Sequence, residues 1–197
     1  EQEDIRALER IRMPHPEEPP AGVHDVGQPA LVGTASIETS ELIDKLRDDY
    51  PEQWQAVLGI RFATEGMLFT EQYLALSAEQ VLQLHHIDCQ RCDIAEIGHL
   101  YAPSRQALMQ LFVLMIQALH QLGVEQLLFA ATSDLKRLLR RHGITLQELA
   151  TANPACLGDK ARDWGSYYQS NPDVCVLAVA EAAQRIQADP RLQQLIF

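Results

Sequence analysis

The chain has 197 residues, of which 47 % are hydrophobic and 22 % are charged, an ordinary balance for a soluble globular domain with a substantial core. Its net charge of −11 argues against nucleic-acid binding and against docking on an anionic membrane, since both depend on clustered lysine and arginine. The first ten residues are charged where a signal peptide is apolar, and four cysteines require no disulfide framework, so we expect a cytoplasmic protein.

The N-terminal part is predicted to be a tail over residues 1–28. Four prolines within residues 13–22 interrupt any regular element there, although a short helix over residues 4–12 is compatible with the sequence. A single domain is predicted over residues 29–180. It opens with a strand of β-branched and small residues at 29–37 and a helix that begins at Thr39 or Ser40.

The middle of the chain is predicted to alternate between strands and helices. Residues 53–63 and 67–74 have strand-like patterns, and the short Thr-Glu-Gly turn between them predicts a hairpin. A short helix is expected over residues 77–85, followed by a strand near residues 93–101.

The most apolar segment follows, as a helix predicted over residues 104–122 and ended by Gly123. Its apolar run is about one turn shorter than the roughly 20 residues that span a bilayer, so we expect a core helix and no transmembrane segment. A strand, a capped helix ended by Gly143, an extended or short helical segment and a last strand come next, before a helical tail over residues 181–197. This order predicts an α/β (α+β) fold with a central mixed sheet flanked by helices.

Four ordered blocks resemble the thermostable hemolysin family over roughly residues 56–178. The blocks are LGIRFATEGMLFTEQYL, IAEIGHLYA, LLFAATSDLKRLLRRHGI and LGDKARDWGSYYQSNPDV. The strand–loop–long helix–strand–helix order is similar to that of GNAT acyltransferases. The family is also distantly similar to acyl-homoserine-lactone synthases, which carry Glu-x-Ser-Arg where residues 96–99 stand. The resemblance implies a GNAT-like fold and acyl transfer from a thioester.

The start of the long helix is the candidate binding site for the acyl donor. Helix N-termini attract phosphate, and an acyl-CoA or acyl-carrier-protein phosphopantetheine carries one, so Ser104, Arg105 and Gln106 are expected to cradle it. A backbone N–H near Leu100 or Tyr101 would polarise the thioester carbonyl. The alternative is that Ser104 only caps the helix and Arg105 is solvated.

Glu96 and His99 are the candidate general bases. A carboxylate on a buried strand is costly unless it is paired, so Glu96 either binds or deprotonates an acceptor, or forms a structural salt bridge with Arg61 or Arg91. For His99 the alternative to catalysis is a structural histidine with satisfied hydrogen bonds.

The acceptor is expected to meet Glu71 and Tyr73, which share one face of the predicted strand, and the aromatic loop that carries Trp164 and Tyr167. Tyr167, or its neighbour Tyr168, would act as the acid toward a leaving thiolate. The alternative is that the aromatic side chains only plug the core. Residues 85–92 include half of a zinc-site pattern, but no second Cys-x-x-Cys follows, and we predict no metal site.

The expected function is therefore transfer of a fatty acyl group from acyl-CoA or an acyl carrier protein to an amine or alcohol, with no tightly bound cofactor and no nucleic acid. Two alternatives stay open. One is a membrane-active hemolysin, which the family name suggests and which would need an exposed amphipathic helix. The other is a catalytically inactive GNAT-like binding module.

Overall fold

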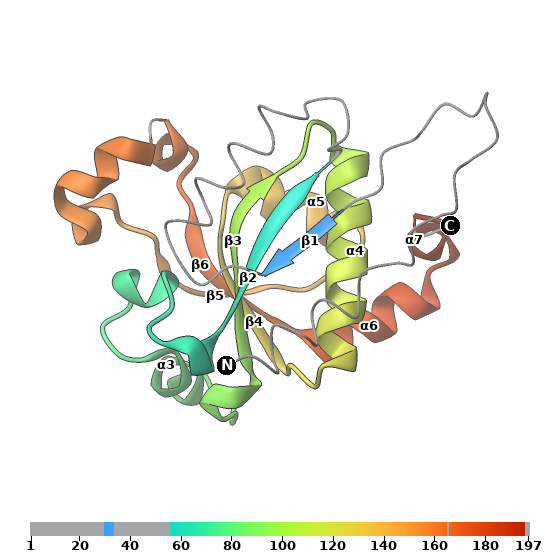
Figure 1. Cartoon of the computed structure of the whole chain (residues 1–197), viewed down its shortest axis with the longest axis horizontal. Coiled ribbons are helices and arrows are strands. Elements are labelled where there is room, and N and C mark those ends of the chain that lie inside the picture. Colours follow the sequence, from blue (N-terminus) through green and yellow to red (C-terminus); the bar gives the residue numbers. More distant parts are fainter. Residues whose placement is uncertain (1–29, 34–55, 165, 196–197) are drawn as a thin grey trace.

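A six-stranded mixed sheet forms the centre of the molecule (Figure 1). The structure is a computed structural model and describes residues 30–33, 56–164 and 166–195. The strands run in the order β1-β2-β3-β4-β6-β5, with β1–β2 and β3–β4 parallel and the other neighbours antiparallel. Their bounds are β1 (Ala30–Gly33), β2 (Val57–Phe62), β3 (Ile94–Tyr101), β4 (Gln126–Ala131), β5 (Gln147–Thr151) and β6 (Asp173–Ala178).

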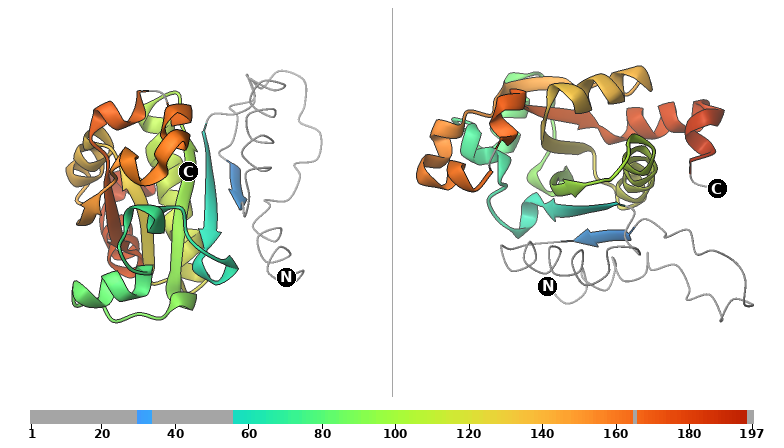
Figure 2. Two further views of the ribbon diagram at one scale, coloured as in Figure 1. Left: turned by 90° about the vertical axis from the view of Figure 1, so that its left-hand side faces the viewer. Right: turned by 90° about the horizontal axis from the view of Figure 1, so that it is seen from above.

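Helices cover the sheet, as the sequence predicts for an α/β fold. The described α-helices are α3 (Ala78–Leu84), α4 (Arg105–Gln121), α5 (Ser133–Arg141), α6 (Val179–Ala188) and α7 (Pro190–Gln193). Figure 2 shows α4 beside the sheet with α6 and α7 next to it, and side chains from all three share one buried cluster with the strands. The predicted strand–loop–long helix–strand–helix order is confirmed by β3, α4, β4 and α5.

Local signals explain the helix ends. Ser104 precedes α4, and its hydroxyl oxygen accepts a hydrogen bond from the Ala107 N–H at 3.1 Å. Gly123 follows α4 with φ +78°, a left-handed conformation that costs glycine little. Between these two ends the helix buries large side chains completely, including Leu111, Phe112 and Met115, which confirms that it is a core helix.

The hairpin predicted between residues 53–63 and 67–74 is wrong. β2 covers the first segment but pairs with β1 and β3, while residues 70–73 form a 3₁₀ turn. The reason is that carboxylates take up the N–H groups that a strand ladder would use. Glu71 accepts from the Leu68 N–H at 2.7 Å, and Glu96 accepts from two further amides of the same segment. The predicted helices over residues 4–12 and from 39 onward lie outside the described residues.

The two central parallel strands pair over only part of their length. The register of β3 with β4 runs from Ile94–Gln126 to Glu96–Leu128, and residues 97–101 of β3 and 129–131 of β4 continue beyond it. We call these two diverging ends the β3–β4 fork. Since β3 leads directly into α4, the helix begins at the end of the sheet toward which the fork opens.

Candidate functional site

Glu96 lies at the point where β3 and β4 separate. Its side chain is almost completely buried, with 3 % of the residue exposed. One carboxylate oxygen accepts a hydrogen bond from the Phe69 N–H at 2.8 Å, and the other accepts from the Thr70 N–H at 2.6 Å. Arg61 stands directly across from Glu96 in β2. The carboxylate is therefore fixed at the apex of the β3–β4 fork by backbone amides with a cation nearby.

The environment of Glu96 makes it a stronger base than an exposed carboxylate. Burial raises its pKa, while the hydrogen bonds from Thr70 and Phe69 and the charge of Arg61 lower it, and the net direction is upward. A carboxylate with a raised pKa accepts a proton more readily from an acceptor group or a water molecule.

The β3 arm of the fork is irregular and sparsely covered. Gly98 lies opposite Gly59 of β2, but the next pair toward the end of β3 joins Tyr101 to Val57, so β3 bulges around residues 99–100. A bulge places one residue of the strand outside the regular ladder and bends the strand locally. A Cβ added at Gly98 would meet no described atom within 4 Å.

The β4 arm is held by the aromatic loop. The hydroxyl of Tyr167 donates a hydrogen bond to the Ala130 carbonyl of β4 at 3.0 Å. Burial raises the pKa of Tyr167 to about 12, so this hydroxyl keeps its proton at neutral pH.

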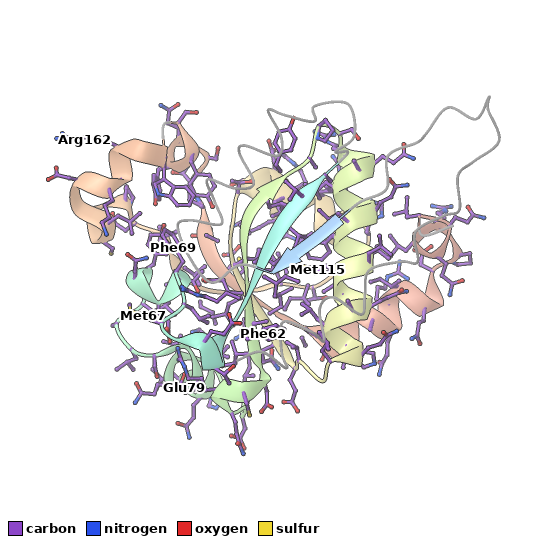
Figure 3. All side chains as sticks on the ribbon, in the orientation of Figure 1. Phe62, Met67, Phe69, Glu79, Met115 and Arg162 are labelled. Atoms are coloured by element: carbon purple, nitrogen blue, oxygen red, sulfur yellow. The ribbon has the colours of Figure 1, made fainter. Side chains whose placement is uncertain are left out.

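Aromatic side chains from residues 69–73 and 164–168 contact one another near the fork, and Figure 3 labels Phe69 among them. We call Phe69, Tyr73, Trp164, Tyr167 and Tyr168 the aromatic cluster. Trp164 lies between Phe69 and Tyr167, with ring-centroid distances of 5.2 and 5.4 Å, and the Tyr73 and Tyr168 hydroxyls are 2.6 Å apart. Because the Phe69 N–H binds Glu96, the cluster is tied to the apex of the fork.

Glu71 belongs to a different arrangement. It accepts hydrogen bonds from the Leu68 and Ala78 amides and forms an ion pair with Arg91 at 2.7 Å. Arg91 also binds Glu79 at 2.8 Å, so its ion pairs join it to Glu71 and Glu79 and not to Glu96. Glu71 and Tyr73 do not share a strand face as expected, because the segment turns: Glu71 meets Arg91, whereas Tyr73 joins the aromatic cluster.

The start of α4 is exposed. Ser104 caps the helix with its hydroxyl oxygen, and Arg105 and Gln106 lie in its first turn with exposed side chains. Leu100 is half-buried and Tyr101 is exposed on the strand that leads to this end. The His99 side chain lies outside the described part of the structure.

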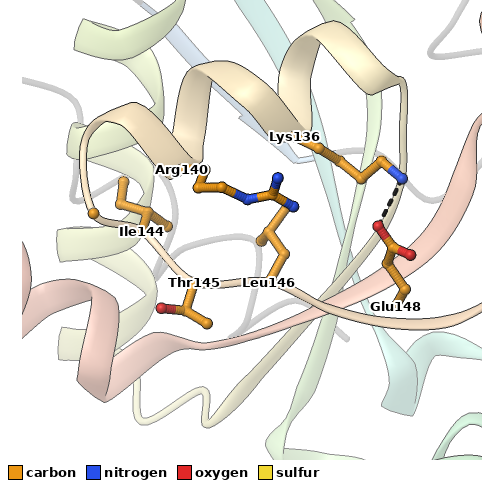
Figure 4. Close-up of a pocket in the computed structure, with 7 residues that line it drawn as sticks. Lys136, Arg140, Ile144, Thr145, Leu146 and Glu148 are labelled. Carbon is orange, nitrogen blue, oxygen red and sulfur yellow. Dashed lines mark hydrogen bonds and ion pairs between the residues drawn. The ribbon is translucent and has the colours of Figure 1, made fainter.

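A further feature lies away from the fork. A cavity of about 130 Å³ lies between α5 and β5, lined by Lys136, Arg140, Thr145 and Glu148 among others (Figure 4). Lys136 is already paired with Glu148 at 2.7 Å and with Asp173, and β6 separates this edge of the sheet from the fork.

Over residues 30–33, 56–164 and 166–195, no three His, Cys, Asp or Glu side chains are grouped so that they could hold a metal ion. Within the same ranges no helix combines the length and the apolar character needed to cross a membrane.

Sequence reasoning missed three parts of this site. Each of these parts is a backbone feature with no side-chain signal in the sequence. They are the N–H groups of Phe69 and Thr70, the Ala130 carbonyl and the pairing of Gly59 with Gly98. Strand register brings the two glycines together, and tertiary contacts of a turn and a loop with β3 and β4 bring the other groups into place.

A family model described as thermostable hemolysin matches residues 38–183. No curated protein sequence matches the chain. The match covers about three quarters of the chain and includes the fork, the aromatic cluster and α4.

Several solved structures are similar at low identity. Apo TofI is 15 % identical with a TM-score of 0.43, over 68 % of this chain and 65 % of TofI. The CoA-dependent acyl-homoserine lactone synthase MesI is 13 % identical with a TM-score of 0.43, over 79 % of this chain and 93 % of MesI. The CoA-dependent synthase BjaI, solved with SAM and isopentyl-CoA, is 11 % identical with a TM-score of 0.37, over 53 % and 43 % of the two chains. The chain thus spans less than two thirds of the length of TofI and BjaI.

Proposed function

The chain belongs to the thermostable hemolysin family, and from this premise we propose that it is an acyltransferase that moves an acyl group from a thioester to an amine or alcohol. The observation that carries the proposal is the β3–β4 fork, with a buried carboxylate at its apex and a helix N-terminus at its open end. Parallel strands that separate give an extended substrate access to backbone groups that a closed ladder would consume.

The donor is proposed to enter the fork from the start of α4. Its phosphate would meet the first-turn N–H groups of α4 together with Ser104, Arg105 and Gln106. Its carbonyl oxygen would accept a hydrogen bond from a backbone N–H near Leu100 or Tyr101, next to the bulge in β3. Acyl-CoA and the phosphopantetheine of an acyl carrier protein both have the required shape and charge, and either is a co-substrate rather than a resident cofactor.

Glu96 is proposed as the general base. The acceptor nitrogen or oxygen attacks the thioester carbonyl carbon and gives its proton to Glu96, directly or through a water molecule, and the carbon–sulfur bond then breaks to release a thiolate. Tyr167 would turn its hydroxyl from the Ala130 carbonyl to the leaving sulfur. His99 remains a second candidate base.

The acceptor is proposed to lie against the aromatic cluster, with Tyr73 and Trp164 as its walls. These side chains are half-buried or nearly buried and surround the segment whose amides bind Glu96. Glu71 is proposed to act indirectly on the acceptor site. Its contacts with Arg91, Leu68 and Ala78 fix the turn that carries Tyr73.

The test is binding and turnover with the purified chain. Octanoyl-CoA is titrated while native mass spectrometry records complexes, and release of free CoA is followed in the presence of mixed amines and alcohols. We expect a one-to-one complex and acceptor-dependent CoA release, abolished in Glu96→Gln. Leakage of liposomes without any acyl donor, combined with no octanoyl-CoA binding, would overturn the proposal in favour of direct membrane activity. Tight binding without turnover would instead make the chain a binding module.

A further inference from the structure

Two glycines face each other in neighbouring strands next to Glu96. Gly59 of β2 pairs with Gly98 of β3, and two positions along the same two strands Arg61 pairs with Glu96. Residues two apart in a strand project from the same face, and so do residues paired across strands. On the sheet face that carries the Glu96 side chain, no side chain therefore projects at the glycine pair.

Among the described residues, no contact requires a glycine at position 98. Its φ is not in the left-handed region, and a Cβ built there meets no described atom within 4 Å. Gly143 is the contrast, because it has φ +71° and a Cβ there would collide with the Arg185 side chain. Glycine inside a strand weakens the strand and commonly marks a position that a ligand or another backbone approaches closely.

Gly98 lies close to the proposed path of the substrate. The residue lies in the part of β3 that has left β4, two positions beyond Glu96 and just before the bulge. Any side chain here would project from the Glu96 face, into the space that the substrate needs to reach the carboxylate.

We propose that Gly98 is a specificity-determining residue that sets how much room the acyl group of the donor has beside Glu96. This inference rests on the acyl-transfer function proposed above. A straight acyl chain lies on the bare backbone of Gly98, so any added side chain shortens or narrows the group that fits. The phosphate end of the donor, bound at α4, is unaffected by this position.

The test compares Gly98→Ala and Gly98→Val with the wild-type chain, by calorimetric titration with octanoyl-CoA and with free CoA. We expect octanoyl-CoA binding to weaken about threefold in Gly98→Ala and about tenfold or more in Gly98→Val, since overfilling a packed site costs more as the side chain grows. Binding of free CoA should not change. The melting temperature should stay equal or rise. The substitution lowers the conformational entropy of the unfolded chain and adds no backbone strain to the folded state.

Ala150→Val serves as the matched control, since it enlarges a half-buried small residue in β5, outside the fork. It should leave both titrations unchanged. If the wild-type chain binds neither octanoyl-CoA nor CoA, the proposed function fails and this inference fails with it. If the wild-type chain binds octanoyl-CoA and Gly98→Val binds it equally well, the inference alone is overturned. A lower melting temperature with parallel loss of CoA binding would make Gly98 a structural residue and would also overturn it.

Discussion

Two buried glutamates, Glu71 and Glu96, have pKa values that are shifted in opposite directions. Glu71 and Glu96 are 7 % and 3 % exposed, and both accept hydrogen bonds from backbone amides of the same short segment. Glu71 in addition forms an ion pair with Arg91, whereas Glu96 has Arg61 across the strand pair and lies where two strands diverge.

The difference appears in their pKa values. Burial raises the pKa of Glu71, but the hydrogen bonds from Arg91, Ala78 and Leu68 outweigh it and bring the pKa below the ordinary 4.5. For Glu96 burial dominates and the pKa rises above that value. Full pairing makes a carboxylate a structural anchor, and incomplete compensation leaves it able to take a proton.

The sharpest way to separate the two residues is the rate of acyl transfer. Glu96→Gln should lower turnover by about 10²- to 10⁴-fold, because the amide cannot accept a proton. Glu71→Gln, which alters a carboxylate of similar burial, should lose much less activity. CoA release is measured for the Glu96→Gln and Glu71→Gln variants under identical conditions. Equal losses would mean that Glu96 acts only through the shape of the segment it binds.

Glu71 should contribute strongly to the stability of the fold. Glu71→Ala removes the acceptor for two amides and the partner of Arg91, so we expect a loss of about 3 kcal/mol in the free energy of unfolding. Urea denaturation of the purified variants measures it. Glu79→Ala is the control, since it removes only the more exposed partner of Arg91 and should cost well under half as much. A neutral Glu71→Ala would contradict the anchoring role.

The pH dependence of stability should have opposite signs at the two sites. The lowered pKa of Glu71 contributes stability above pH 4.5 that is lost as the pH falls through the folded-state value. The raised pKa of Glu96 contributes stability below pH 4.5 that is lost as the pH rises through its folded-state value. Unfolding free energies of the wild type and of each glutamine variant, measured from acid to neutral pH, give the two differences. If the two differences changed with pH in the same direction, the proposed contrast between Glu71 and Glu96 would be wrong.

The smallest expected effect concerns the tyrosine pair that closes the acceptor side. Tyr168→Phe breaks the 2.6 Å hydrogen bond with Tyr73 and should cost about 1 kcal/mol of unfolding free energy. The double variant with Tyr73→Phe should lose about as much as either single variant, because the two hydroxyls share one bond. Additive losses would show that each hydroxyl has another partner, and chemical denaturation distinguishes the outcomes.

Much of the scaffold around the site could be read from local patterns. The Ser104 cap, the apolar run of α4 and the glycine after it predict a buried helix that the structure contains, and residues 94–101 form the predicted strand. Residues 67–74 have an equally apolar pattern but form a turn. Their conformation depends on Glu96, whose contacts with Thr70 and Phe69 span 26 and 27 positions of the chain.

The sequence by itself therefore determined the family, the alternation of strands and helices, and the residue types available for chemistry, because caps and periodicity act within a few positions of the chain. Only the tertiary structure decided that β3 and β4 part after Glu96, that Gly59 meets Gly98, and that Arg91 binds Glu71. Those outcomes depend on strand register and on competition between distant partners for the same amides and charges, and both are resolved only when the whole sheet assembles.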